Sequence, residues 1–234
     1  MQYLDERISE EKYDNLRDAY TELRETYQNY INFQPDGTNP EFRDPETGNK
    51  GVLPSLHQKI ALYHLLNEKR FGIFDGCGTG KTAIATLSQP LIEKKLEAEG
   101  KEFRRTVIVC PNPAKKAWKK GLEGKLEERY LTESQDIIVI NRERKNASLL
   151  EELAHKKWIV LNYEQLTTKV NGSDKLFVDA LIDMGIDHVI LDESHQIKGH
   201  RKETKKGRPT RSAAARKLAN SVEYLCLLTG SPIP

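Results

Sequence analysis

The sequence predicts an α/β protein whose parallel sheet is flanked by helices on both faces. Short runs rich in β-branched residues alternate with longer helical patterns such as ASLLEELAHK and KLFVDALIDMG. That alternation is typical of successive βαβ units. The expected strands are FGIFD, TVIVCP, DIIVIN, WIVLNY, HVILDE and YLCLLTG. Because ligands of such sheets bind outside the carboxyl ends of the strands, the residues that follow each run are the candidates for function.

A helical extension precedes the expected sheet. Large apolar residues recur at steps of three and four, which predicts an N-terminal helix whose apolar stripe packs on the main domain or on a partner helix. They are Tyr13, Leu16, Tyr20, Leu23, Tyr27 and Tyr30. The segment NFQPDGTNPEFRDPETGNKG is dense in Pro, Gly, Asn and Asp and predicts an irregular linker. We therefore expect a helix and linker over residues 1–50 and one larger domain over residues 51–234.

Composition excludes several classes of protein. The chain has 234 residues, 37% hydrophobic and 31% charged, with a net charge of +2, as in a globular protein with a solvated surface. No apolar run is long enough to cross a bilayer, so no membrane partner is expected. The polar N-terminus resembles no targeting signal, so we expect an intracellular protein, cytoplasmic in a prokaryote or virus and nuclear in a eukaryote. Cys77, Cys110 and Cys226 are too far apart to indicate a zinc site or a disulfide framework.

The stretch FDGCGTGKT, from Phe74 to Thr82, predicts a phosphate-binding loop between a strand and a helix. The pattern G-x-x-x-x-G-K-[ST] requires a glycine where this chain has Asp75. The backbone N–H groups of such a turn and of a helix beginning at Lys81 can surround a phosphate. Lys81 would add its charge, and the Thr82 hydroxyl would reach Mg²⁺. The alternative is an ordinary tight turn.

An acidic pair ends another expected strand, in HVILDESH. A carboxylate at the position of Asp192 can hold the coordination shell of Mg²⁺. Glu193 is then placed to orient or deprotonate a water that attacks the γ-phosphate. Alone, two acids at a strand end can simply be solvated, but together with the glycine-rich loop they indicate a nucleotide site.

These motifs resemble a known family. DGCGTGKT, DESH and LTGSPIP, in this order, resemble motifs I, II and III of superfamily-two helicases, and most closely the Swi/Snf-type double-stranded DNA translocases. That family writes its first motif D-E-M-G-x-G-K-T, so Asp75 is a family trait. VIVCPNPAKKAWKKGLE resembles motif Ia, IVLNYEQL a tyrosine-containing strand, and LPSLHQKIALYHLL the adenine-side segment. The resemblance covers Leu53 to Pro234.

The resemblance implies the first RecA-like lobe of an ATP-dependent nucleic-acid motor, with ATP and Mg²⁺ as its cofactors. It implies double-stranded DNA as the nucleic-acid partner, and a second RecA-like lobe that supplies an arginine finger, so this lobe alone is expected to hydrolyse ATP very slowly. Lys81, Asp192 and Glu193 are the implied catalytic residues, and Thr82 and Asp192 the metal-binding ones. The implied nucleotide contacts are Gln58, Asp75, Gly76, Cys77, Gly78, Thr79, Gly80, Lys81, Thr82 and His195.

Three further positions follow from the same resemblance. His195 would link the γ-phosphate site to motif III through the hydroxyls of Thr229 and Ser231, or it could be a buried structural histidine. Trp118 lies in register with motif Ia, and could equally be a core aromatic residue. Leu56 and His57 depart from the basic and aromatic residues that are frequent in the family.

A basic segment, GHRKETKKGRPTR, follows the acidic pair. Its cations, among them Lys205, Lys206 and Arg208, could track a nucleic-acid backbone, because each phosphate contact releases condensed counterions. The alternative is a solvated surface loop.

Other functions remain open at this point. An RNA-unwinding or restriction-type helicase would share the motifs. A nucleotide-dependent binding module with little turnover is a second alternative, although Glu193 argues against it. A small-molecule kinase would share the phosphate loop but has no reason to carry DESH and LTGSPIP.

Overall fold

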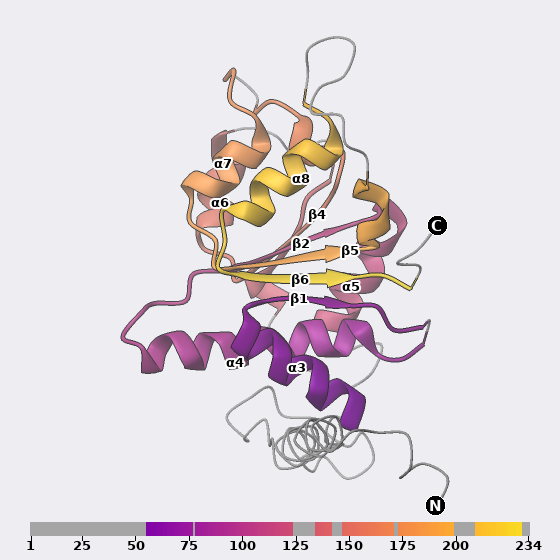
Figure 1. Cartoon of the computed structure of the whole chain (residues 1–234). Helices are drawn as coiled ribbons and strands as arrows, with labels where there is room; N and C mark the ends of the chain where they lie inside the picture. Colours follow the sequence, from indigo (N-terminus) through magenta and orange to yellow (C-terminus); the bar gives the residue numbers. More distant parts are fainter. Residues whose placement is uncertain are drawn as a thin grey trace, which may run out of the picture.

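The computed structural model describes residues 55–76, 78–123, 134–141, 147–170, 173–198 and 209–230 (Figure 1). The expected N-terminal helix and linker, Cys77, Ser231 and the candidates Lys205, Lys206 and Arg208 lie outside these residues. The α-helices are α3 (Leu56–Glu68), α4 (Lys81–Ala98), α5 (Lys115–Leu122), α6 (Ala147–Ala154), α7 (Phe177–Asp183) and α8 (Arg211–Asn220). The strands are β1 (Arg70–Ile73), β2 (Thr106–Cys110), β3 (Ile137–Val139), β4 (Trp158–Asn162), β5 (His188–Asp192) and β6 (Tyr224–Leu228). Short 3₁₀ helices are η1 (Asn112–Ala114), η2 (Ser134–Asp136), η3 (Gln165–Thr167) and η4 (Ser194–Ile197).

The strands form one parallel sheet in the order β1-β6-β5-β2-β4-β3, which confirms the expected α/β class. The register brings three strand ends to one level. Leu228 at the end of β6 pairs with Ile73 at the end of β1 and with Asp192 at the end of β5. The residues after these strands therefore emerge side by side at the carboxyl edge of the sheet.

The sheet has helices on both faces (Figure 1). Helices α6, α7 and α8 pack on one face, where Val189 and Leu191 of β5 join their apolar side chains. Helices α3, α4 and α5 cover the other face, which Ile190 of β5 joins. Both faces of β5 are buried, as expected for a strand inside a parallel sheet, and this explains why its apolar run is continuous rather than alternating. Cys110 and Cys226 lie in this core as free, buried thiols.

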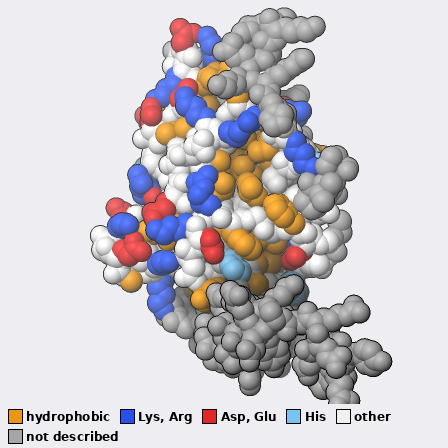
Figure 2. Space-filling model, in the orientation of Figure 1, with side chains coloured by type: hydrophobic (Ala, Val, Ile, Leu, Met, Phe, Trp, Pro, Cys, Tyr) orange, Lys and Arg blue, Asp and Glu red, His pale blue; other side chains and the backbone are white. Residues whose placement is uncertain are grey.

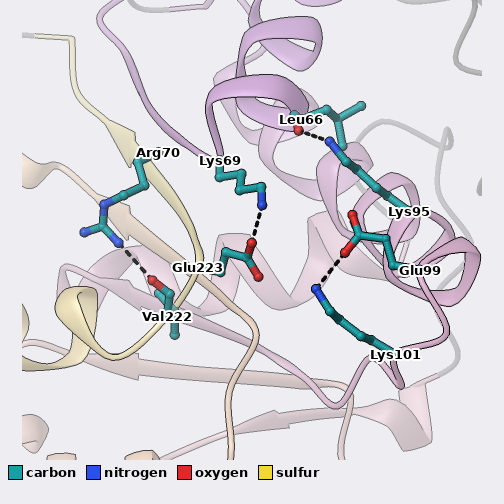
Figure 3. A network of polar contacts seen from close by, with 8 residues as sticks. All are labelled: Leu66, Lys69, Arg70, Lys95, Glu99, Lys101, Val222 and Glu223. Carbon is teal, nitrogen blue, oxygen red and sulfur yellow. Dashed lines mark hydrogen bonds and ion pairs between the residues drawn. The ribbon is translucent and has the colours of Figure 1, made fainter.

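The amino edge of the sheet is closed by a network of charged side chains (Figure 3). Lys69, the C-cap residue that follows α3, has a left-handed φ of 64° and pairs with Glu223, and Arg70 Nη1 donates to the carbonyl of Val222 at 2.9 Å. Nearby, Lys101 Nζ contacts Glu99 Oε2 at 2.7 Å. Such exposed pairs add little stability, so their main effect is to fix how the chain enters β1 and β6.

None of the helices in the described ranges is both long enough and apolar enough to span a bilayer.

Candidate nucleotide site

The glycine-rich turn joins β1 to α4 at the carboxyl edge of the sheet. Gly78 and Gly80 both have a φ of 81°, a left-handed conformation that residues with a side chain rarely adopt. Gly80 is the N-cap of α4, and a Cβ atom added at Gly76 or at Gly78 would meet no atom within 4 Å. The turn therefore borders open space in front of the N-terminus of α4, where backbone N–H groups can meet an anion.

Lys81 lies at the first position of α4 and folds over the turn. Its Nζ donates to the main-chain oxygens of Asp75 at 2.7 Å and of Gly76 at 2.6 Å. The Thr79 hydroxyl donates to the same Gly76 oxygen at 3.0 Å. The ammonium group is thus held inside the turn by two carbonyl oxygens. When a phosphate group binds, its oxygens would take the place of these carbonyls as hydrogen-bond partners of Lys81.

Helix α3 supports the turn from the side. Gln58 is buried, its Oε1 accepts the Ser55 N–H at 3.0 Å, and its Nε2 would lie 2.5 Å from a Cβ atom at Gly80. His57 Nε2 lies 2.9 Å from the carbonyl oxygen of Thr79. Gln58 therefore has a structural role in capping α3 and packing on the turn, and its contact with adenine stays a prediction.

The acidic pair lies at the end of β5, where Asp192 is the last residue of the strand and Glu193 is the first residue after it. Asp192 Oδ1 accepts the N–H of Glu193 at 3.0 Å, and Oδ2 accepts the indole N–H of Trp118 at 2.8 Å. Burial raises the pKa of the Asp192 carboxyl, and the hydrogen bond from Trp118 and the positive charge of Lys81 act against that rise. Lys81 and Asp192, which belong to separate motifs, therefore interact electrostatically.

Glu193 adopts an unusual backbone conformation, with a φ of 50°. A side-chain-bearing residue in this region is strained, and such strain is common at functional sites. Its Oε2 lies 3.1 Å from Nδ1 of His195, and the same nitrogen lies 3.0 Å from the Thr229 hydroxyl. The structure thus brings Glu193, His195 and Thr229 together, and the role of His195 as a link between the γ-phosphate site and motif III stays a prediction.

The motifs include two aromatic residues of the site, Trp118 and Tyr163, but do not indicate that both contact Asp192. Trp118 is only 2% exposed, so it is a core residue, yet its N–H reaches the Asp192 carboxylate. The hydroxyl of Tyr163, just after β4, donates to the main-chain oxygen of Asp192 at 2.7 Å. The available signal was chemical, because a buried Trp or Tyr needs a partner for its polar atom. Tyr163 directly follows β4, whereas Trp118 lies within α5.

The side-chain oxygens of this site are suitable ligands for Mg²⁺. Thr82 and Asp192 offer hydroxyl and carboxylate oxygens, the ligands that a hard cation prefers. Within the described part of the chain no group of three or more His, Cys, Asp or Glu residues could hold a metal ion. Magnesium is commonly bound by one or two protein oxygens, together with water and substrate phosphates.

A hollow lies beside α5 and the edge strand β3. It has a volume of about 510 Å³, and its lining includes Asn112, Lys115, Lys116, Lys119 and one acid, Glu152. Lys115 is buried and donates to the carbonyl of Ile140 at 2.9 Å, whereas Lys116 and Lys119 are exposed. We call this hollow the lysine pocket. Its excess of cations suits an anionic ligand.

A smaller, mainly apolar hollow of about 300 Å³ lies on the other side of the phosphate turn. Its lining includes Phe74, Ile197, Leu227 and Thr229. Phe74 is 55% exposed, which is unusual for so large an apolar side chain. Figure 2 shows hydrophobic side chains gathered on the face of the molecule that Figure 1 presents, with Lys and Arg around them.

Comparison with known proteins places these features in a family. The family model of the SNF2-related domain matches residues 57–234. A relative, the p41 protein of Acyrthosiphon pisum secondary endosymbiont phage 1, is 28% identical over 187 residues, which cover 79% of this chain and 37% of that protein.

Solved structures share the fold at low sequence identity. The UvsW helicase of bacteriophage T4 superposes with a TM-score of 0.53 at 16% identity, covering 89% of this chain and 60% of that one. The Sulfolobus solfataricus SWI2/SNF2 ATPase core in complex with dsDNA superposes with a TM-score of 0.51 at 16% identity, covering 86% of this chain and 35% of that one. The chain therefore spans less than two thirds of the length of each of these proteins.

Proposed function

The chain belongs to the SNF2-related domain family, the superfamily-two type of helicase lobe, and on that premise we propose that it binds ATP with Mg²⁺ at the carboxyl edge of its sheet. The chain hydrolyses this ATP to drive movement on, or remodelling of, double-stranded DNA. One observation carries the proposal. The phosphate turn, Glu193 and Thr229 follow three strands that end at the same level, at Ile73, Asp192 and Leu228.

The proposed chemistry assigns a task to each group. The turn and the N-terminus of α4 bind the phosphates, and Lys81 exchanges its two carbonyl partners for phosphate oxygens. Thr82 and Asp192 would hold Mg²⁺, which neutralises phosphate charge when it is bound. Glu193 accepts a proton from the attacking water while the water oxygen forms a bond to the γ-phosphorus. The bond from that phosphorus to the oxygen that bridges the β- and γ-phosphates breaks, and ADP and phosphate leave.

A second RecA-like lobe is part of the proposal. Hydrolysis in this class of ATPase needs a cation at the γ-phosphate, and an arginine finger contributes about a thousandfold or more. The exposed Phe74 and the apolar hollow beside Thr229 support a partner surface next to the phosphate turn.

Nucleic-acid binding is supported by charge. The lysine pocket presents Lys116 and Lys119 of α5, the helix whose Trp118 contacts Asp192, and the basic segment that contains Lys205, Lys206 and Arg208 follows the acidic pair in sequence. Cations that contact phosphates would bind DNA irrespective of its sequence.

The test is steady-state ATP hydrolysis by this chain, alone and with duplex DNA, single-stranded DNA or RNA, with Glu193→Gln as the matched control. We expect slow hydrolysis, little stimulation by duplex DNA, and weak binding of Mg-ATP that the Gln variant retains while losing hydrolysis. Stimulation by RNA alone would favour an RNA helicase, and normal nucleotide binding without hydrolysis, even with a second lobe present, would favour a binding module. Strong DNA-stimulated turnover by this chain would contradict the need for a second lobe.

A further inference from the structure

Helix α5 contacts both residues that are proposed to hold the metal ion. From one turn of the helix the Trp118 indole N–H donates to Asp192 Oδ2 at 2.8 Å. From the next turn Gly121 lies beside Thr82, since a Cβ atom at Gly121 would be 3.7 Å from the Thr82 methyl carbon. A single short helix thus packs against both Thr82, which offers a hydroxyl to the metal ion, and Asp192, which offers a carboxylate.

The Asp192 carboxylate is held at both of its oxygens. The backbone N–H of Glu193 occupies one side of Oδ1, and the Trp118 N–H occupies one side of Oδ2. Each carboxylate oxygen has two acceptor positions, so one remains on each oxygen for a cation or its water shell. With a donor at each oxygen, rotation of the carboxylate about its bond to Cβ would break a hydrogen bond.

The main chain at Asp192 is held as well. The Tyr163 hydroxyl donates to the Asp192 carbonyl oxygen at 2.7 Å, immediately before the left-handed residue Glu193. Asp192 is therefore held by Trp118 of α5 at its carboxylate and by Tyr163, just after β4, at its main chain, and not only by its own strand.

We propose that Trp118 is a positioning residue, which holds the Asp192 carboxylate in the orientation that binds Mg²⁺ and so sets the metal dependence of nucleotide binding. The inference rests on the proposed function and deepens it. Groups that orient a metal ligand from outside the coordination shell typically change metal affinity about 10- to 100-fold when they are removed.

The experiment compares Trp118→Phe with Trp158→Phe. Both tryptophans are 2% exposed, but Trp158 starts β4, at the edge of the sheet opposite Asp192. Each substitution removes the same atoms from a buried site, so the second one controls for loss of packing. Binding of a fluorescent ATP analogue is measured by anisotropy in EDTA and across a Mg²⁺ titration, together with the thermal unfolding midpoint of each variant.

We expect Trp118→Phe to keep the metal-free affinity within about twofold and to shift the Mg²⁺ midpoint upward about tenfold or more. Trp158→Phe should leave the midpoint unchanged. Replacing Trp118 with 3-benzothienylalanine, which keeps the ring shape and has sulfur in place of the N–H group, should reproduce the shift.

Three results would overturn the inference. The first is an unchanged Mg²⁺ midpoint in a folded Trp118 variant, and the second is an equal shift in Trp158→Phe, which would show a packing effect. The third is failure of the unsubstituted chain to bind the analogue with or without Mg²⁺, which would also overturn the proposed function, whereas the first two leave that function intact.

Discussion

The imidazole of His195 lies 3.0 Å from the hydroxyl of Thr229, and this contact joins the segment after β5 to the segment after β6. The same nitrogen lies 3.1 Å from Glu193, the proposed catalytic carboxylate. We expect Thr229→Val to leave binding of an ATP analogue within about twofold and to slow hydrolysis about tenfold, because His195 loses one of the partners that orient it toward Glu193. Thr229→Ser keeps the hydroxyl and should restore the rate in the same assay. Equal rates in Val and Ser variants would show that the contact is not used.

Lys81→Ala should weaken binding of a fluorescent ATP analogue about 10- to 100-fold. The substitution removes a cation that donates charge-assisted hydrogen bonds, each of which contributes about 1.5–3 kcal/mol. Lys94→Ala, on the exposed part of the same helix, changes the charge equally and should have no effect. Unchanged affinity in Lys81→Ala would contradict the assignment of the phosphate turn.

The left-handed backbone at Glu193 predicts an inversion of the ordinary order of stability. Inside an α-helix or a strand glycine is less stable than alanine, but at a φ of 50° the Cβ atom of alanine is strained and glycine is not. We expect Glu193→Gly to be more stable than Glu193→Ala by about 1 kcal/mol in urea unfolding. Both variants should lack hydrolysis. If the alanine variant were the more stable one, the left-handed conformation would not be that of the folded protein in solution.

The lysine pocket can be tested through salt dependence. Lys116→Ala with Lys119→Ala should weaken duplex binding for all sequences alike and reduce the slope of log K against log salt by about one unit per lost phosphate contact. Alanine at Lys94 and Lys101, which are not among the residues that line the pocket, gives the same change in net charge as a control. A slope that matches the control variant would exclude the pocket as a DNA contact.

The basic segment is tested in the same way, with Lys205, Lys206 and Arg208 replaced by Ala. A reduced slope supports a contact with the nucleic-acid backbone, and an unaltered slope favours the solvated loop.

Acid should destabilise the fold through His188, which is fully buried. Burial lowers its pKa from 6.5 to about 3, so between these values the unfolded chain binds a proton that the folded chain does not. Stability is therefore unaffected above pH 6.5 and falls as pH decreases below it, by about 2 kcal/mol at pH 5. Urea unfolding of the unsubstituted chain and of His188→Leu at several pH values checks this. The free energy of unfolding of the variant should lack the decrease below pH 6.5 that His188 causes. Parallel pH profiles would show that His188 is accessible to protons in the folded state.

Strands β2, β4 and β5 were predictable because each is a compact apolar run that is buried almost throughout, whereas β1 lies at the edge of the sheet and is exposed at Arg70. The expected runs match the six strands to within a few residues; for example, β1 begins at Arg70 and ends at Ile73, so that Phe74 and Asp75 already belong to the turn. The motifs also placed Asp192, Glu193 and Thr229 at strand ends and Lys81 at the start of a helix, because terminal polar residues mark the strand ends and a glycine-rich turn precedes the helix.

Contacts between distant segments were not predictable in this way. Trp118 is 74 residues away from Asp192 in sequence, and nothing in local periodicity indicates which polar atom its N–H will meet. Lys81 contacts carbonyls of its own turn, a choice that depends on the backbone conformation of Gly78 and Gly80 rather than on residue type. The side-chain partners of Gln58 likewise follow from how α3 packs on the turn.

Helix α5 ties the evolution of two sites together. Its lysines line one hollow, while Trp118 and Gly121 touch the two candidate metal ligands. Among homologues, a change at position 118 that loses the N–H donor should then be accompanied by a change near position 192, and a large side chain at position 121 by a smaller one at position 82. Substitutions in this helix are constrained both by the lysine pocket and by the metal site. Its apolar and small residues should therefore vary less among homologues than is usual for so short a helix with so many exposed charges.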